Sequence, residues 1–300
     1  MSAPRAPRRF PFVQLDVFTN RPLEGNQLAV FTDARGLGDA EMQAVAREMN
    51  FSETTFVLPR TAPAPGGPTR VRIFTVEEEL PFAGHPTLGT ASVLRGASGA
   101  REVVLDLGVG LVPVTFEDGP EGAFGEMRQR DPVFGATHPR EEVARALGVG
   151  PDALDPALPV QTVSTGLAFA VVPFRSLATL RALRVEWGRL EAWLAGRDAK
   201  FLYLVCRETV DPGAQLHARM LFYGGEDPAT GSAAGCCAAW MVAHGVVAPD
   251  ERVVIEQGLE ARRPSRLFVR AGRSGGAVGD VRVGGYVAEV ARGELALPGG

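Results

Sequence analysis

The sequence predicts an α+β protein with two similar domains, each built from short strands around one buried helix. A repeated phrase is the first observation behind this prediction, because 84–91 reads GHPTLGTA and 226–233 reads EDPATGSA. The second observation is that 18–31 and 163–174, which precede the two copies, both place an apolar run after a turn at a Gly. Matched segments in one order indicate a duplicated domain rather than a short-repeat solenoid.

The first half is expected to contain strands and two helices. Helical spacing of apolar residues predicts a helix over 39–49, and the repeated phrase opens a second helix within 81–97. This second helix is apolar on nearly every side, so we expect it to be buried. Apolar and β-branched runs bounded by turn residues predict strands at 13–18, 27–31, 54–58, 69–76, 102–107 and 109–116.

The second half repeats this order after a linking segment. Residues 118–138 are rich in Gly, Pro and charge and are expected to form a crossover, followed by a surface helix between Pro139 and Gly148. A helix over 186–194 and a buried helix over 232–244 come next. The strands of this half are expected as a pair within 159–173 and then at 201–207, 215–223, 253–257, 266–271, 280–283 and 286–294.

These elements predict two domains and a returning strand. We place the first repeat domain at 1–118 and the second at 119–283. The C-terminal strand, within 284–300, is expected to pair back onto the first domain.

The composition is that of an ordinary globular protein, with 45% apolar residues, 22% charged residues and a net charge of -4. Nucleic-acid binding proteins concentrate Lys and Arg on one face, so this balance argues against a nucleic-acid partner. The basic N-terminus, MSAPRAPRR, is expected to be a disordered tail. We expect neither a signal peptide nor a membrane span, and therefore a soluble, cytoplasmic protein without a membrane partner.

The three cysteines all lie in the second half, at Cys206, Cys236 and Cys237. Their spacing fits neither a metal site nor a disulfide framework, so they are expected to be small packing residues. An enzyme with one catalytic thiol on each side of a cleft would need a cysteine in the first half as well. The sequence therefore argues against a two-thiol mechanism.

Two facing domains would form a cleft, which is the usual place for a small ligand. Each repeated phrase precedes a helix, whose free N–H groups and positive dipole end favour an anion, so the pair predicts a carboxylate clamp. Small residues that allow close backbone approach and hydroxyl donors would line this clamp: Gly84, Gly231, Thr87, Thr90, Thr230 and Ser232.

His85 and Asp227 occupy matching positions in the two phrases, and both residue types handle protons. Glu53 lies in FSETTFVL, where a half-buried carboxyl among apolar neighbours would have the raised pKa that suits a general acid or base. Plainer interpretations stay open: a structural His85, an Asp227 that caps the helix begun by Pro228, and a Glu53 that caps or lies at the surface.

Five stretches, in this order and spacing, closely resemble the PhzF-like phenazine-biosynthesis family. They are DVFTNRPLEGNQLAVF, MNFSETTFVL, ELPFAGHPTLGTA, STG and EDPATGSAAG, and the resemblance runs over 13–295. That family shares the fold of diaminopimelate epimerase. The resemblance therefore implies that each domain is a strongly curved, mostly antiparallel sheet around its buried central helix, and that the protein is a homodimer.

The resemblance also implies an activity and a site. It implies isomerisation of trans-2,3-dihydro-3-hydroxyanthranilate by a proton shift, without metal or organic cofactor, with Glu53 as the acid and base. The family's substrate-binding residues match His85, Asp227 and Ser232. Near the C-terminus the chain reads QGLEARRPS where the family tends toward QG..MGRPS, so the charged Arg262 is expected to change the pocket or its rim.

Two other functions fit the same residues. The chain could be an amino-acid racemase or epimerase that uses Glu53 and Asp227 on opposite faces of its substrate. Alternatively, it could be a small-molecule binding protein that keeps the cleft without turnover.

Overall fold

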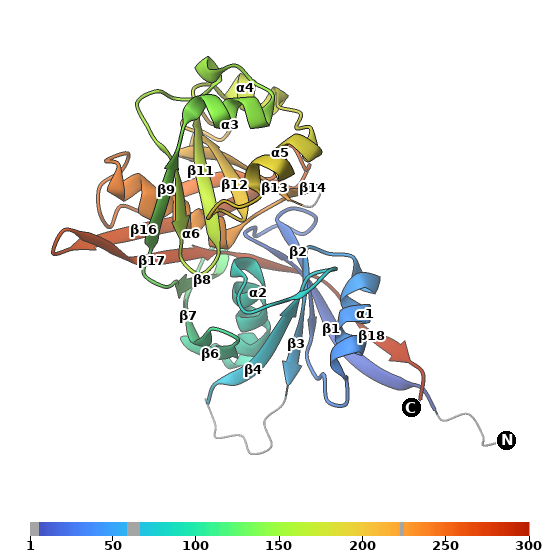
Figure 1. Cartoon of the computed structure of the whole chain (residues 1–300). Helices are drawn as coiled ribbons and strands as arrows, with labels where there is room; N and C mark the ends of the chain where they lie inside the picture. The colour runs from blue at the N-terminus through green and yellow to red at the C-terminus, as the bar shows by residue number, and fades with distance from the viewer. Residues whose placement is uncertain (1–5, 59–66, 223–224, 300) are drawn as a thin grey trace. The chain divides into compact units, whose positions relative to one another are not determined.

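A computed structural model describes residues 6–58, 67–222 and 225–299, which divide into two compact units. The first unit is Met1–Gly125 with Tyr286–Gly300, and the second is Glu126–Gly285. Each unit combines a mixed sheet with a few helices, so the chain is an α+β protein (Figure 1). No helix in the described ranges is long and apolar enough to cross a membrane.

The sheet of the first unit joins the two ends of the chain. Its strands are β1 (Arg8–Val17), β2 (Asn26–Phe31), β3 (Glu53–Leu58), β4 (Thr69–Phe74), β5 (Glu79–Leu80), β6 (Glu102–Leu107), β7 (Gly110–Gly119) and β18 (Val287–Leu297). β1 pairs antiparallel with both β18 and β2. Then β2–β3 is parallel, β3–β4 antiparallel, β4–β6 parallel and β6–β7 antiparallel.

One helix of the first unit is buried, and the other covers an aromatic cluster. α2 (Gly84–Arg95) contacts β1, β2, β3, β6 and β7, and its residues from the start to Ala91 are all buried. Gly89 permits this close packing, because a Cβ there would lie 2.6 Å from a methyl group of Leu28. α1 (Asp39–Met49) packs its apolar side on phenylalanines of β2, β3 and β4, and η1 (Gly96–Ser98) follows α2.

The second unit has the same succession of pairings. Its strands are β9 (Val133–His138), β10 (Val160–Ser164), β11 (Ala168–Phe174), β12 (Phe201–Cys206), β13 (Leu216–Phe222), β14 (Gly225–Asp227), β15 (Val253–Gln257), β16 (Ser265–Ser274) and β17 (Ala277–Gly285). β10–β11 is antiparallel, β11–β12 parallel, β12–β13 antiparallel, β13–β15 parallel and β15–β16 antiparallel. These orientations match those from β1 to β7 in order.

α6 (Gly231–Ala243) is the buried helix of the second unit and contacts β10, β11, β16 and β17. Its residues are buried from the first to Val242, as expected for a helix that is apolar on every side. A separate apolar cluster joins the other helices to β11 and β12. These helices are α3 (Arg140–Leu147), η2 (Pro151–Ala153), α4 (Leu177–Ala182) and α5 (Trp187–Leu194).

Two sequence-based expectations differ from the structure. The expected crossover 118–138 contains two strands, β8 (Gly122–Arg128) and β9, because its glycines serve turns and close contacts within paired strands. The expected N-terminal tail is also shorter, since β1 already begins at Arg8 and pairs there with Leu297. Residues 1–5 of that tail, and residues 59–66 between the strands expected at 54–58 and 69–76, lie outside the described residues.

Candidate active site

Three polar side chains meet in the first unit, where β2 and β3 begin and α2 makes its first turn. His85 Nε2 lies 3.5 Å from Glu53 Oε2, and His85 Nδ1 lies 3.3 Å from Asn26 Nδ2. The parallel register brings β2 and β3 to the same edge, because Leu28 is opposite Glu53. Asn26 is an addition to the sequence-based site. Gly25, with φ +68°, precedes it, and a Gly before a polar strand start was the available signal.

His85 is neutral near pH 7. Burial lowers the pKa of its imidazole from 6.5 to about 3, although a backbone hydrogen bond with Gln27 acts in the opposite direction. The short distance to Glu53 is therefore a contact between a neutral imidazole and a carboxyl group rather than an ion pair. A neutral imidazole can donate from Nε2 to a carboxylate or accept there from a carboxylic acid, depending on its tautomer. His85 can therefore form a hydrogen bond with Glu53 whether the Glu53 carboxyl group is ionised or protonated.

The second unit holds the other predicted side chains around the start of α6. Asp227 ends β14, and its Oδ2 accepts a hydrogen bond of 2.6 Å from Thr230 Oγ1. Thr230 is the N-cap residue of α6, so Asp227 is not, and the capping interpretation of Asp227 is wrong. Gly231 and Ser232 form the first turn and are buried with it. The positive end of the helix dipole thus lies beside a fixed acid and two hydroxyl-bearing residues.

Gln257, which the sequence-based site lacked, holds this turn. Its Nε2 donates to Asp227 O at 2.8 Å and Thr230 Oγ1 at 3.0 Å. Its Oε1 accepts from Thr230 N at 3.2 Å and from Tyr203 Oη at 3.1 Å. The side chain is fully buried, so these bonds replace its water contacts. A polar residue that ends β15, a strand begun by three apolar residues, was the available signal in the sequence.

A second buried amide, that of Gln129, supports the same helix. Gln129 Nε2 donates to Gly231 O at 3.0 Å, and Gln129 Oε1 accepts from Thr165 Oγ1 at 2.6 Å. A Cβ at Gly235 would collide with the Gln129 amide, so this glycine makes room for it. The STG segment thus contributes Thr165 to the support of α6.

Two hydroxyl groups of the predicted clamp have partners inside the first unit. Thr87 Oγ1 donates to Ala83 O at 2.7 Å, and the hydroxyl groups of Thr90 and Thr55 lie 2.8 Å apart. Both are buried in α2. The hydroxyl hydrogen of Thr87 is used within the helix, contrary to its expected role as a ligand donor, and that role of Thr90 stays a prediction.

The cysteines are poorly suited to proton transfer. All three are buried, and burial is the main cause that raises the pKa of each thiol. The pKa of Cys236 rises to about 11. Because the thiolate is the reactive form, these groups are inert near neutral pH.

The predicted site residues are divided between the two units. Glu53, Gly84, His85, Thr87 and Thr90 belong to the first, and Asp227, Thr230, Gly231 and Ser232 belong to the second. Within each unit, the residues gather at the first turn of the buried helix, α2 or α6.

The comparisons with known proteins agree with one another. The model of the family described as "Phenazine biosynthesis-like protein" matches residues 15–293. The chain is 36% identical to trans-2,3-dihydro-3-hydroxyanthranilate isomerase of Pseudomonas aeruginosa, over 95% of this chain and 99% of that protein. A solved structure titled as a predicted epimerase, also from Pseudomonas aeruginosa, is 40% identical, with a TM-score of 0.80 over 95% of this chain and 99% of that chain. A PhzF family protein of Bacillus anthracis is 27% identical, with a TM-score of 0.83 over 96% and 99% of the two chains.

Proposed function

Since this chain belongs to the phenazine biosynthesis-like family, we propose that it is an isomerase that shifts a proton on a small carboxylate substrate without a cofactor. Its substrate would resemble trans-2,3-dihydro-3-hydroxyanthranilate. The contact between Glu53 and a buried, neutral His85 is the observation that supports this proposal most strongly. An acid and base needs a partner that tolerates both of its protonation states, and a neutral imidazole meets this need.

In this mechanism Glu53 moves the proton. A C–H bond of the substrate breaks, the proton passes to the Glu53 carboxylate, and the electron pair enters the conjugated system. The carboxylic acid then returns the proton to another carbon, which regenerates the carboxylate. His85 would orient the carboxyl group throughout, and Asn26 would orient His85.

The second unit would bind the rest of the substrate. The first turn of α6, with Gly231 and Ser232, would hold the substrate carboxylate and stabilise charge that develops during the reaction. Thr230, whose hydroxyl group donates to Asp227, would hold the Asp227 carboxyl group in place beside this turn. Asp227 would bind an amino or hydroxyl substituent. Gly84 would let the substrate approach the start of α2.

We also propose that the two units descend from one duplicated domain, each with a curved sheet around α2 or α6. The matching order of parallel and antiparallel pairings supports a common origin. The functional protein would be a homodimer. Light scattering that gives the monomer mass of 31.8 kDa at micromolar concentration would overturn this assembly.

The variant Glu53→Gln tests the proton carrier. It should abolish turnover while ligand affinity stays within about tenfold. The amide keeps the shape and most hydrogen bonds of the carboxyl group, but it cannot take a proton from the substrate and return it. The matched control is Glu102→Gln, at an exposed carboxylate of β6, and it should leave turnover unchanged. Near-normal turnover in the Glu53 variant would overturn the mechanism.

Reaction in deuterium oxide tests the proton shift itself. Amino- and hydroxy-substituted cyclic carboxylates, including trans-2,3-dihydro-3-hydroxyanthranilate, would be incubated with the protein and the products read by NMR. We expect deuterium from solvent at the receiving carbon, or migration of deuterium from a labelled donor carbon when the proton returns internally. Product without either label would refute the proposal. A product differing only in chirality would favour the racemase alternative, and binding without product the binding-protein alternative.

A further inference from the structure

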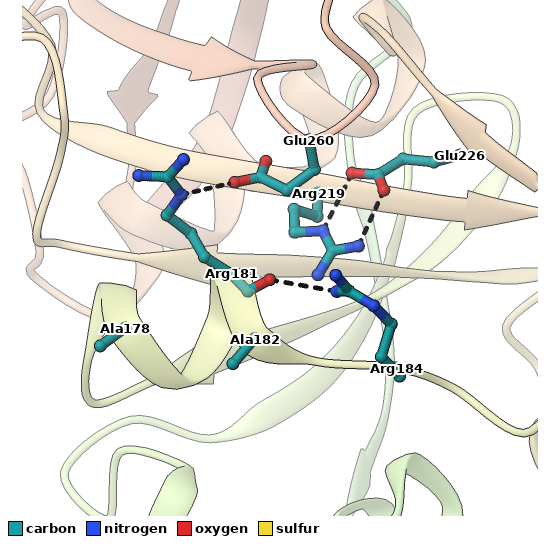
Figure 2. A pocket seen from close by; sticks show the side chains of 7 residues that line it. All are labelled: Ala178, Arg181, Ala182, Arg184, Arg219, Glu226 and Glu260. Atoms are coloured by element: carbon teal, nitrogen blue, oxygen red, sulfur yellow. Dashed lines mark hydrogen bonds and ion pairs between the residues drawn. The ribbon is translucent and has the colours of Figure 1, made fainter.

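A pocket of about 700 Å³ lies in the second unit (Figure 2). Its volume is within the range of small-molecule sites. α4, the segment just after it, β13, β14 and the loop after β15 supply its walls. Its described lining residues are Ala178, Arg181, Ala182, Arg184, Arg219, Glu226 and Glu260. This set shares no residue with the proposed isomerase site.

The buried arginine of the pocket is fully engaged with the protein. Arg219 donates from Nε and Nη2 to the two carboxylate oxygens of Glu226, at 2.9 and 2.8 Å. Its Nη1 donates to Leu180 O at 2.8 Å and Leu183 O at 3.2 Å, near the end of α4. The side chain is only 6% exposed. Arg219 and Glu226 therefore neutralise each other, and both oxygens of Glu226 are occupied.

The second carboxylate of the pocket is also occupied on both oxygens. Glu260 Oε1 accepts from Arg181 Nε at 2.9 Å, as Figure 2 shows, and Glu260 Oε2 lies 3.2 Å from His217 Nε2. His217 Nδ1 lies 2.7 Å from Glu256 on its other side. Burial lowers the pKa of His217, but the hydrogen bonds to Glu260 and Glu256 outweigh it and raise the pKa overall.

Two arginines keep donors to spare. Among the contacts of the described residues, Arg181 uses Nε, and Arg184 uses Nη1, which donates to the carbonyl oxygens of Arg181 and Leu183. A guanidinium has five N–H donors in a fixed plane, so each retains donors for a ligand. Both arginines are exposed, and the small side chains of Ala178 and Ala182 in α4 complete this part of the lining. The lining has three arginines against two glutamates, so its surplus charge is positive.

We propose that this pocket binds a small anion through phosphate or carboxylate oxygens, held by Arg181 and Arg184. Each oxygen of the lining carboxylates already has a polar partner within the protein, whereas the guanidinium groups of Arg181 and Arg184 have N–H donors left for an acceptor-bearing ligand. Arginine pairs with phosphate and carboxylate groups by parallel hydrogen bonds, which gives such a site both strength and orientation. This ligand would bind in the pocket beside α4 and would require Arg181 and Arg184, whereas the isomerase substrate would bind at the first turns of α2 and α6.

Calorimetric titration of the full chain with inorganic phosphate, and separately with succinate, tests the proposal at constant ionic strength. We expect saturable binding of at least one anion with a dissociation constant of about 1 mM or lower. Arg184→Gln should weaken it at least about tenfold, because charge-assisted hydrogen bonds are lost. This variant leaves the contact between Arg181 and Glu260 in place. The control Arg207→Gln, at an exposed arginine of the same unit, should bind like the original protein.

A substitution that fills the pocket provides an independent test. Ala182→Leu adds bulk at an exposed position without changing charge, so it should abolish binding in a protein that still folds, as circular dichroism would verify. Glu53→Gln should leave anion binding unchanged. No binding of either anion, or binding that both pocket variants leave unchanged, would overturn the proposal. Loss of succinate binding in Ser232→Ala, with normal binding in Arg184→Gln, would place the anion at the isomerase site and refute it as well.

Discussion

Replacing Gln257 with leucine should destabilise the second unit more than the small change in side-chain volume suggests. Leucine fills a similar volume but removes four hydrogen bonds, which join the side chain to Asp227 O, Thr230 N, Thr230 Oγ1 and Tyr203 Oη. The two hydroxyl groups can rotate toward other partners, and Thr230 Oγ1 still donates to Asp227. The backbone C=O of Asp227 and the backbone N–H of Thr230 cannot rotate, so each loses the partner that Gln257 supplies.

A buried polar group that loses its hydrogen-bond partner lowers the free energy of unfolding by about 1–3 kcal/mol. Two such groups give about 2–6 kcal/mol, and the apolar burial gained by leucine offsets about 1 kcal/mol of this. We therefore expect Gln257→Leu to lower the free energy of unfolding by about 3 kcal/mol. Turnover should fall too, because Asp227 and the first turn of α6 lose their shared support.

Urea unfolding followed by tryptophan fluorescence suits this measurement. All three tryptophans, Trp187, Trp193 and Trp240, belong to the unit that contains Gln257. The same substitution at Gln215, which is exposed, provides the control and should cost less than about 1 kcal/mol. If the two variants are equally stable, the Gln257 network does not hold the turn.

The remaining predictions concern the cysteines and His217. Replacing all three cysteines with serine should leave turnover intact apart from packing losses, and a thiol reagent should label the native protein slowly at pH 7, because burial raises each thiol pKa. An inactive but folded triple variant would restore a thiol mechanism. His217 has a raised pKa in the folded protein, so its stabilising contribution is complete below its unfolded pKa and declines as pH rises through the folded value. The difference in unfolding free energy between the original protein and His217→Gln should therefore shrink from pH 6 toward pH 9, and a difference that grows would refute the assignment.

Some parts of the molecule were accessible from sequence because they depend on local pattern. The two buried helices follow from all-round apolarity, and α6 from Gly231 to Ala243 is close to the range expected. Glu53 was found because it begins an apolar, β-branched strand, and the structure places it beside His85. The roles of these residues in catalysis stay predictions, as does the common origin of the two units.

Other parts depend on contacts that local pattern does not encode. Gln257 reaches Thr230 only because β15 pairs in parallel with β13, and that register is set by residues distant in sequence. Asn26 likewise meets His85 through the packing of α2 on β2. The segment 118–138, which contains β8 and β9, is expected from sequence to be a crossover. A Gly that tightens a turn and a Gly that makes room for a neighbouring side chain cannot be told apart in one sequence.

The pairing of β1 with β18 sets an order for folding during synthesis. Arg8 is opposite Leu297, so β1, which is made before the second unit, is paired with β18, which is made after it. The second unit is fully translated before β18 appears, and it can fold on the ribosome, whereas the first unit must wait with one edge of β1 open. An open strand edge is a template for pairing with other chains. Deleting β18 would leave the edge of β1 open permanently. We therefore expect this deletion to destabilise the first unit more than the second.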